Sequence, residues 1–87
     1  MVTYSINRKD ENTVEIIFKD VEYSILNELR ERMLENEDVT FASVIEDHPE
    51  KKNLIMKIKT KDKDPLTYLR KAAKELIKDV EKLSADL

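Results

Sequence analysis

Residues 64–87, which read DPLTYLRKAAKELIKDVEKLSADL, carry the strongest structural signal in this sequence. Apolar side chains recur there at alternating spacings of three and four residues, which is typical of a helix that lies along another helix. These positions are Leu66, Leu69, Ala73, Leu76, Val80, Leu83 and Leu87. Asp64 can cap the free amides of the first turn and Pro65 suits the first helical position, so we expect the helix to begin here. No stop signal follows, and the helix is predicted to run to Leu87.

A helix of this length spans roughly 36 Å at 1.5 Å per residue, which is more than the sheet of one small domain covers. We therefore expect part of the apolar stripe to pack on another chain. The 87 residues are interpreted as one domain. A chain of that size hides only about 60% of its unfolded surface, so a partner helix would add to a marginal core. The alternative is a stripe that packs only within the domain.

The composition excludes several classes of protein. Hydrophobic and charged residues each make up 40% of the chain and the net charge is −3, which indicates a globular protein and argues against a nucleic-acid binder with a basic surface. Glycine is absent, which excludes phosphate-binding loops, dinucleotide fingerprints and nucleophile elbows. The amino terminus has no basic stretch followed by an apolar run, and no segment is apolar enough to span a bilayer. We therefore expect a cytoplasmic protein.

Two short alternating runs near the amino terminus predict a β-hairpin. Val2, Tyr4 and Ile6 share one face of the first strand, and Val14, Ile16 and Phe18 share one face of the second. The polar segment 8–12 is interpreted as the loop between them, in which Asn and Asp are expected to adopt the left-handed conformation of a tight turn.

Between Asp20 and Asn36 the apolar period becomes helical, with Ser24 as the expected amino-terminal cap. The apolar side of this helix consists of Ile25, Leu26, Leu29, Met33 and Leu34. Two further strands follow at residues 40–46 and 54–58, joined by a polar turn over residues 47–53. The order ββαββα predicts an α+β two-layer sandwich, in which both helices cover one face of a four-stranded antiparallel sheet.

Three stretches of the chain follow one another in a recognisable order. Residues 22–30, EYSILNELR, fit the pattern acidic-His-Thr-Leu-x-Asn-x-Leu-Arg through Glu22, Ile25, Asn27, Leu29 and Arg30. Residues 39–43, VTFAS, and 47–49, DHP, are spaced after it in the same way. In this the chain resembles the family of archaeal RNA polymerase subunit L, which is related to the amino-terminal domain of the bacterial α subunit. It departs from the family pattern at Tyr23, Ser24, Val44 and Glu50.

The resemblance implies a non-catalytic assembly role in DNA-directed RNA polymerase, a nucleotidyltransferase complex that carries out transcription. Members of this family pair with the D-type subunit of the same enzyme, and the large catalytic subunits are built on that heterodimer, with a small zinc-binding subunit nearby. No cofactor and no direct sequence-specific contact with DNA are implied for the subunit itself. The predicted partner interface consists of Ile25, Leu26, Asn27, Leu29, Arg30, Met33, Leu69, Ala73, Leu76, Val80 and Leu83. Asn27 has the alternative role of bonding locally and shaping the motif.

Two polar features have both a functional and a structural interpretation. His48, with Glu46, Asp47 and Glu50 around it, outlines a divalent-ion or acid–base site, but a polar turn between strands explains the same residues, and a single His without Cys is a poor ligand set. Lysines at 71, 74, 78 and 82 follow one side of the last helix and could contact nucleic acid or acidic protein. Acidic residues interleave with them, as on an ordinary solvated helix face.

Two other classes of function stay open. A small RNA-binding or protein-interaction α+β module would need exposed aromatic residues on the open sheet face, whereas Tyr4, Phe18 and Phe41 are expected to point with the core. A small enzyme would need a nucleophile–base pair. Serines 5, 24, 43 and 84 with one His offer no plausible triad.

Overall fold

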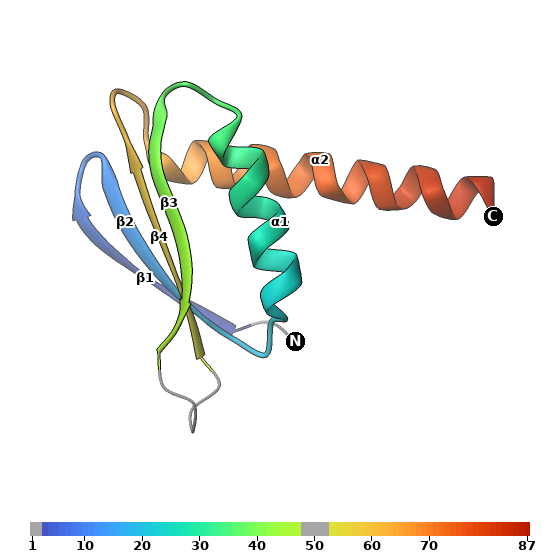
Figure 1. Ribbon diagram of the computed structural model, residues 1–87, viewed down its shortest axis with the longest axis horizontal. Helices are drawn as coiled ribbons and strands as arrows, with labels where there is room; N and C mark the ends of the chain where they lie inside the picture. Colours follow the sequence, from blue (N-terminus) through green and yellow to red (C-terminus); the bar gives the residue numbers. More distant parts are fainter. Residues whose placement is uncertain (1–2, 48–52) are drawn as a thin grey trace.

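The computed structural model describes residues 3–47 and 53–87 and confirms the predicted fold class. The order is β1 (Thr3–Asp10), β2 (Thr13–Lys19), α1 (Tyr23–Leu34), β3 (Val39–Glu46), β4 (Asn53–Thr60) and α2 (Pro65–Asp86). The strands form one antiparallel sheet in the order β1-β2-β4-β3. Both helices lie on the same side of this sheet, and α2 crosses α1 and continues beyond the other elements (Figure 1).

The hydrophobic core fills the space between the sheet and the helices. Ile16 of β2 is opposite Met56 of β4, and Met56 is opposite Val44 of β3, so one row of side chains faces the helices across three strands. The buried apolar residues are Val14, Ile16, Leu26, Leu29, Met33, Val39, Ala42, Val44, Leu54, Met56, Ile58, Tyr68 and Ala72. Helix α1 packs chiefly over β3, and α2 packs over β2 and β4. Strand β1 is left exposed along its whole length.

The start of α2 is confirmed and that of α1 differs by two residues. The Asp64 side chain accepts a hydrogen bond of 3.0 Å from the backbone N–H of Leu66, and Pro65 is the first helical residue. The amino-terminal cap of α1 is Glu22, not Ser24 as predicted, and it makes no side-chain capping bond. Glu22 has an extended backbone and its carbonyl accepts the first helical bonds, from Ile25 and Leu26, so Ser24 is already inside the first turn.

The turns also differ from the prediction, because β1 extends to Asp10. Only Glu11 and Asn12 form the hairpin turn, and the Asp10 side chain closes it by accepting a 2.8 Å hydrogen bond from the backbone N–H of Asn12. The prediction of left-handed Asn and Asp in this loop is wrong: among the described residues the left-handed one is Asp20, with φ of 60°, in the bend after β2. Aspartate tolerates this region better than most residues, which suits a chain without glycine.

The two faces of the sheet agree with the predicted alternation in β2 and β4 but not for Phe41. Phe18 lies on the helix face opposite Leu54, as expected. Phe41 lies opposite Lys59 on the other face, where no described helix covers it, because Ala42 and Val44 take the buried positions of β3. The prediction that Phe41 points with the core is therefore wrong. Val2 and residues 48–52, which include His48 and Glu50, lie outside the described residues.

Candidate subunit interface

The second half of α2 projects beyond the rest of the molecule (Figure 1). The helix has 22 residues, which corresponds to about 33 Å. Only the first half packs on the sheet, and its buried residues are Pro65, Tyr68 and Ala72. In the second half Ile77, Val80 and Leu83 are 57%, 57% and 59% exposed. Large apolar side chains gain about 1.5–3 kcal/mol each when they are fully buried, so this surface is suited to a partner.

The predicted apolar stripe of α2 is divided between two environments. Leu69, Ala73 and Leu76 are partly buried and pack against the core of the chain, whereas Val80 and Leu83 are exposed. The prediction missed Ile77, because it followed a narrow 3.5-residue seam. An apolar face on a helix with 3.6 residues per turn is wider than such a seam, and the neighbouring apolar residue Ile77 was a usable signal.

An ion-pair network fixes α2 at the point where it leaves the body of the molecule. The Arg32 guanidinium of α1 donates a 2.7 Å hydrogen bond to Asp79 of α2 and a 2.9 Å hydrogen bond to Glu28 of α1. Asp79 first, and then Glu28, raises the pKa of Arg32 above its ordinary value. Lys71 of α2 also donates to the side chain of Asn36, which follows α1. These polar contacts add to the apolar packing that holds α2 against α1 and the core.

A second apolar surface lies beside the first turns of α2, on the part of the sheet that no helix covers. It is a groove of about 260 Å³, lined by Tyr4, Ile6, Ile16, Phe18, Leu66, Leu69 and Arg70. Tyr4 and Ile6 belong to β1 and are largely exposed, although both point to the helix side of the sheet. This groove and the projecting half of α2 are therefore two apolar surfaces on the same side of the sheet.

The predicted interface residues of α1 have different places in the structure. Leu26, Leu29 and Met33 are buried in the core of the chain, which argues against their contacting a partner. Ile25 is exposed and lies two helical turns before Arg32, on the side of α1 that carries the bond to α2. Of the apolar residues predicted on this helix for the interface, Ile25 is the one that stays accessible.

Asn27 and Arg30 of α1 bond within the chain. The Arg30 guanidinium donates a 3.0 Å hydrogen bond to the backbone carbonyl of Ala42 and a 3.1 Å hydrogen bond to the side chain of Asn27. Asn27 in turn donates to Glu31. Because β3 is an edge strand, Arg30 satisfies a backbone acceptor at the edge of the sheet. This geometry favours the motif-shaping role of Asn27 over a contact with a partner.

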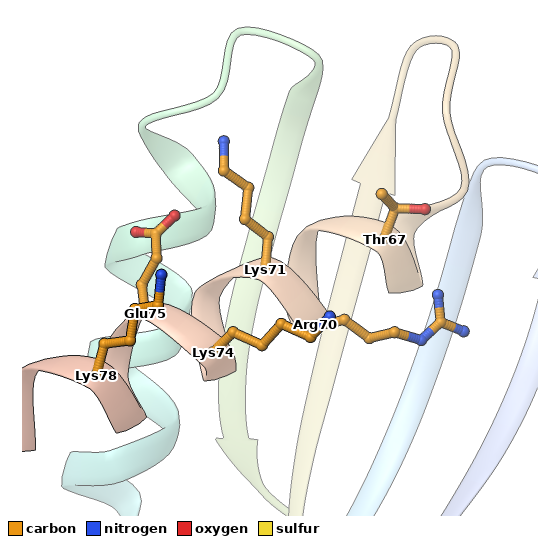
Figure 2. A pocket seen from close by; sticks show the side chains of 6 residues that line it. All are labelled: Thr67, Arg70, Lys71, Lys74, Glu75 and Lys78. Atoms are coloured by element: carbon orange, nitrogen blue, oxygen red, sulfur yellow. The ribbon is translucent and has the colours of Figure 1, made fainter. Parts of the chain in front are cut away.

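The lysine stripe predicted on α2 borders a shallow hollow on the outer side of the helix, shown in Figure 2. The hollow has a volume of about 440 Å³ and is lined by Thr67, Arg70, Lys71, Lys74, Glu75 and Lys78. Arg70 extends from it toward the strands in Figure 2, whereas Lys71 points toward the connection between α1 and β3, where it donates to Asn36. Its cations are exposed and Glu75 lies among them, so the face resembles an ordinary solvated helix surface.

The described residues contain no group of three or more His, Cys, Asp or Glu side chains that could hold a metal ion. His48, and with it the ion-site interpretation, lies outside residues 3–47 and 53–87. No helix within those ranges is long and apolar enough to cross a membrane.

A two-layer fold with an exposed apolar helix half and an adjoining apolar groove defines a small module that associates with other chains. Residues 13–86 match the family model described as the RNA polymerase Rpb3/Rpb11 dimerisation domain. The chain belongs to this family and is an RNA polymerase subunit of the Rpb3/Rpb11 type. The resemblance to subunit L is confirmed, as is the expectation that the chain is part of a nucleotidyltransferase complex.

Curated relatives agree with this assignment, and a solved structure agrees with the fold. The chain is 33% identical over 66 residues to RNA polymerase subunit Rpo11 of Methanothrix thermoacetophila, covering 76% of this chain and 72% of the relative. It is 29% identical over 86 residues to the RNA polymerase II subunit RPB11 of Schizosaccharomyces pombe, covering 98% of this chain and 70% of the relative. The crystal structure of RNA polymerase subunit L from Thermoplasma acidophilum has the same fold, with a TM-score of 0.86 and 21% identity over 99% of this chain and 85% of that chain.

Proposed function

We propose that this chain forms a heterodimer with a D-type subunit and that the pair nucleates assembly of the large catalytic subunits of RNA polymerase. The observation that carries the proposal is the exposed apolar half of α2, with Ile77, Val80 and Leu83 free of the core. Dimerisation would remove these side chains from water, which is the main favourable term in most protein association.

The positions of the two apolar surfaces suggest how the subunits pair. A partner with a related fold would also have a projecting helix and a groove on the same side of its sheet. In an arrangement close to two-fold, the helix of each subunit reaches the groove of the other. Tyr4, Ile6 and Phe18, which line the groove of this chain, would then be covered by the partner.

We propose a partner interface formed by residues of both helices. These are Ile25, Leu69, Ala73, Leu76, Ile77, Val80 and Leu83. Leu69, Ala73 and Leu76 are half-buried, and the partner would cover the part of their surface that is still exposed. The buried residues Leu26, Leu29 and Met33 hold α1 in place, and the Arg30–Asn27 pair anchors α1 to β3, so that Ile25 is presented at the surface.

The wider assembly is also part of the proposal. Residues 1–87 act as one dimerisation domain, the large catalytic subunits and a small zinc-binding subunit join the heterodimer, and the complex works in the cytoplasm. The chain itself is expected to make no sequence-specific contact with DNA, because its charge is net negative.

Co-expression with the D-type subunit, followed by size-exclusion chromatography with mass determination, tests the pairing. The unmodified chain should elute as a 1:1 heterodimer. Leu83→Glu should abolish that species, because it places a charge in the apolar contact. Lys78→Glu introduces the same side chain on the opposite side of α2, beside Glu75, and should leave the heterodimer intact.

These measurements must distinguish loss of the interface from misfolding of the chain. Leu83 is largely exposed in the isolated chain, so Leu83→Glu should retain the circular dichroism spectrum of the unmodified chain. A normal yield of heterodimer from Leu83→Glu would show that the projecting half of α2 is not the contact surface.

A further inference from the structure

The sheet face opposite the helices carries an apolar row that the proposed dimerisation does not use. The open face is defined here by Thr3, Ser5, Glu15, Ile17, Lys19, Phe41, Ser43, Ile45, Ile55, Lys57 and Lys59. Ile17 of β2 is opposite Ile55 of β4, and Ile55 is opposite Ile45 of β3. Residues directly opposite in antiparallel strands have Cβ atoms about 5 Å apart, so the three isoleucines form one continuous row.

This row is unusual for a sheet that is covered on one side only. In antiparallel sheets with one solvated face, the solvated positions are normally polar. Here Ile45 is 56% exposed and Phe41, four residues away on the same strand, is 44% exposed, whereas Ile17 and Ile55 are half-buried. Contiguous exposed apolar residues rimmed by polar ones are typical of a site of protein contact.

The charges around the row are mainly positive. Lys57 is directly opposite Glu15, but the Glu15 carboxylate lies 3.5 Å from the ammonium of Lys9. Lys59 lies over the Phe41 ring, with its ammonium 5.9 Å from the ring centre. Within residues 3–47 and 53–87, neither Lys57 nor Lys19 has a carboxylate at ion-pair distance.

The row ends at β1 in a small hollow whose wall is mainly apolar. Its volume is about 130 Å³, and its lining residues are Thr3, Tyr4, Ser5, Ile17 and Lys19. Of these residues, Thr3, Ser5 and Lys19 belong to the open face and bear two hydroxyl groups and one ammonium. Such a set of donors is suited to a carboxylate, which accepts hydrogen bonds only.

We propose that the open face binds an acidic, amphipathic segment of another subunit of the same polymerase. Apolar side chains of the segment cover Ile17, Ile55 and Ile45, and a carboxylate enters the hollow at Lys19. Two features support this inference: the positive charges on the open face complement an acidic segment, and the hollow at Lys19 lies at the end of the isoleucine row. It rests on membership of the polymerase family and not on the proposed heterodimer, because the open face is on the opposite side of the sheet from both helices.

A protein segment fits this face better than RNA does. Sheets that bind single-stranded RNA stack bases on two or three aromatic side chains, whereas the open-face set defined above contains one, Phe41. The chain is also net negative. Three adjacent isoleucines offer apolar contact but no stacking plane.

Site-directed cross-linking in the intact polymerase tests the proposal. The chain contains no cysteine, so Ile45→Cys gives one attachment point on this subunit for a short benzophenone-maleimide cross-linker. After photolysis, mass spectrometry should identify one peptide of another subunit that contains apolar residues and Asp or Glu. Lys78→Cys, on the outer side of α2, is the matched control and should not link to that peptide.

A second measurement tests how binding depends on charge substitutions in the open face and on salt concentration. Lys19→Glu and Ile45→Asp should each weaken binding of the remaining polymerase subunits at least tenfold, while the unmodified chain should lose affinity as salt concentration rises. Ser24→Glu, an exposed change on α1, is the control and should have no such effect on this face. Unchanged binding by both open-face variants, no cross-link from Ile45→Cys, or binding of an oligouridine probe that Phe41→Ala abolishes would each overturn the proposal.

Discussion

The Tyr68 hydroxyl of α2 donates a 2.8 Å hydrogen bond to the Asp38 carboxylate, which lies in the turn between α1 and β3. The same carboxylate accepts the backbone N–H groups of Asp62 and Lys63 at 2.8 and 3.0 Å. Asp38 thus joins the end of α1, the loop after β4 and the first turns of α2. This junction and the Arg32–Asp79 pair act together with the apolar packing of Leu69, Ala73 and Leu76 to hold α2 in its direction.

The first prediction concerns this junction. Asp38→Ala should lower the melting temperature of the chain, because two backbone N–H groups and one hydroxyl lose their acceptor. Tyr68→Phe removes only one of the three bonds and should lower it less. Thermal melting followed by circular dichroism gives the order, and Glu37→Ala, an exposed change in the same turn, should be nearly neutral. A Tyr68→Phe variant that melts lower than Asp38→Ala would contradict this account.

The second prediction is a loss of stability in acid. The backbone N–H of Lys63, with Tyr68 and Asp62, lowers the pKa of Asp38, and the backbone N–H of Leu66, with Arg8, lowers the pKa of Asp64. A depressed folded-state pKa means that the unfolded chain binds the proton first. The stabilisation is therefore complete above the unfolded value of about 3.9 and is lost as the pH falls through the folded pKa values.

Melting temperatures between pH 7 and pH 2 test this prediction. The unmodified chain should be most sensitive below about pH 4, where the carboxylates become protonated. Asp38→Asn cannot titrate at that position, so its melting temperature should vary less with pH over this range. Equal pH dependence in the two proteins would show that Asp38 does not contribute to acid sensitivity.

Local signals predicted most of the fold, and tertiary packing decided the rest. Asp64 and Pro65 specify a helix start through their own chemistry, and the structure agrees. The sequence did not decide which side chains of β3 face the helices. Phe41 and Ile45 are as apolar as Ala42 and Val44, which lie on the other face. The packing of α1 over β3 selects the smaller pair for the buried side.

The candidate interface was predictable only in part, again because tertiary packing decides which residues are buried. The spacing in α2 correctly indicated a helix with more apolar surface than one small core needs. Which half remains exposed depends on where the sheet ends beneath α2, and that is not encoded in the helix itself. The buried position of Tyr68 and the exposed position of Ile77 both follow from this crossing geometry.

The third prediction concerns the left-handed residue Asp20, whose φ is 60°. Asp20→Val should lower the free energy of unfolding by about 1–2 kcal/mol, because a β-branched side chain is disfavoured in this region. Asp20→Gly and Asp20→Asn should change it by less than about 1 kcal/mol, since both residues adopt this conformation readily. Urea denaturation measures the three values. Equal stability of the Val and Gly variants would exclude a left-handed conformation at residue 20.

The fourth prediction separates the core from the exposed surface in the isolated chain. Met33 is 0% exposed, so Met33→Ala should cost about 2–5 kcal/mol through lost burial and an unfilled cavity. Leu83→Ala should change stability by less than about 0.5 kcal/mol, because Leu83 has few contacts within its own chain. Urea denaturation at low protein concentration is the measurement. A large effect of Leu83→Ala under these conditions would indicate that the chain self-associates through α2.

The last prediction tests whether the projecting end of α2 contributes to binding without contributing to the stability of the fold. Leu76 is a poor probe, because it packs on the core and its truncation would also destabilise the isolated chain. Deletion of residues 81–87 removes Leu83 and Leu87 but keeps Asp79, which bonds Arg32. The shortened chain should melt near the unmodified one. Its affinity for the D-type subunit should fall at least about 100-fold, since burial of two leucines contributes about 3 kcal/mol or more.

A full-length variant with Leu83→Gln and Leu87→Gln distinguishes lost apolar contact from lost helix length. Glutamine is a good helix former, so α2 should keep its extent while losing its apolar end. If apolar burial carries the association, this variant should bind the D-type subunit as weakly as the shortened chain in a titration by fluorescence anisotropy. Near-normal affinity of the glutamine variant, together with weak binding of the shortened chain, would instead assign the contact to the polar side of the helix end, where Glu81 and Lys82 lie.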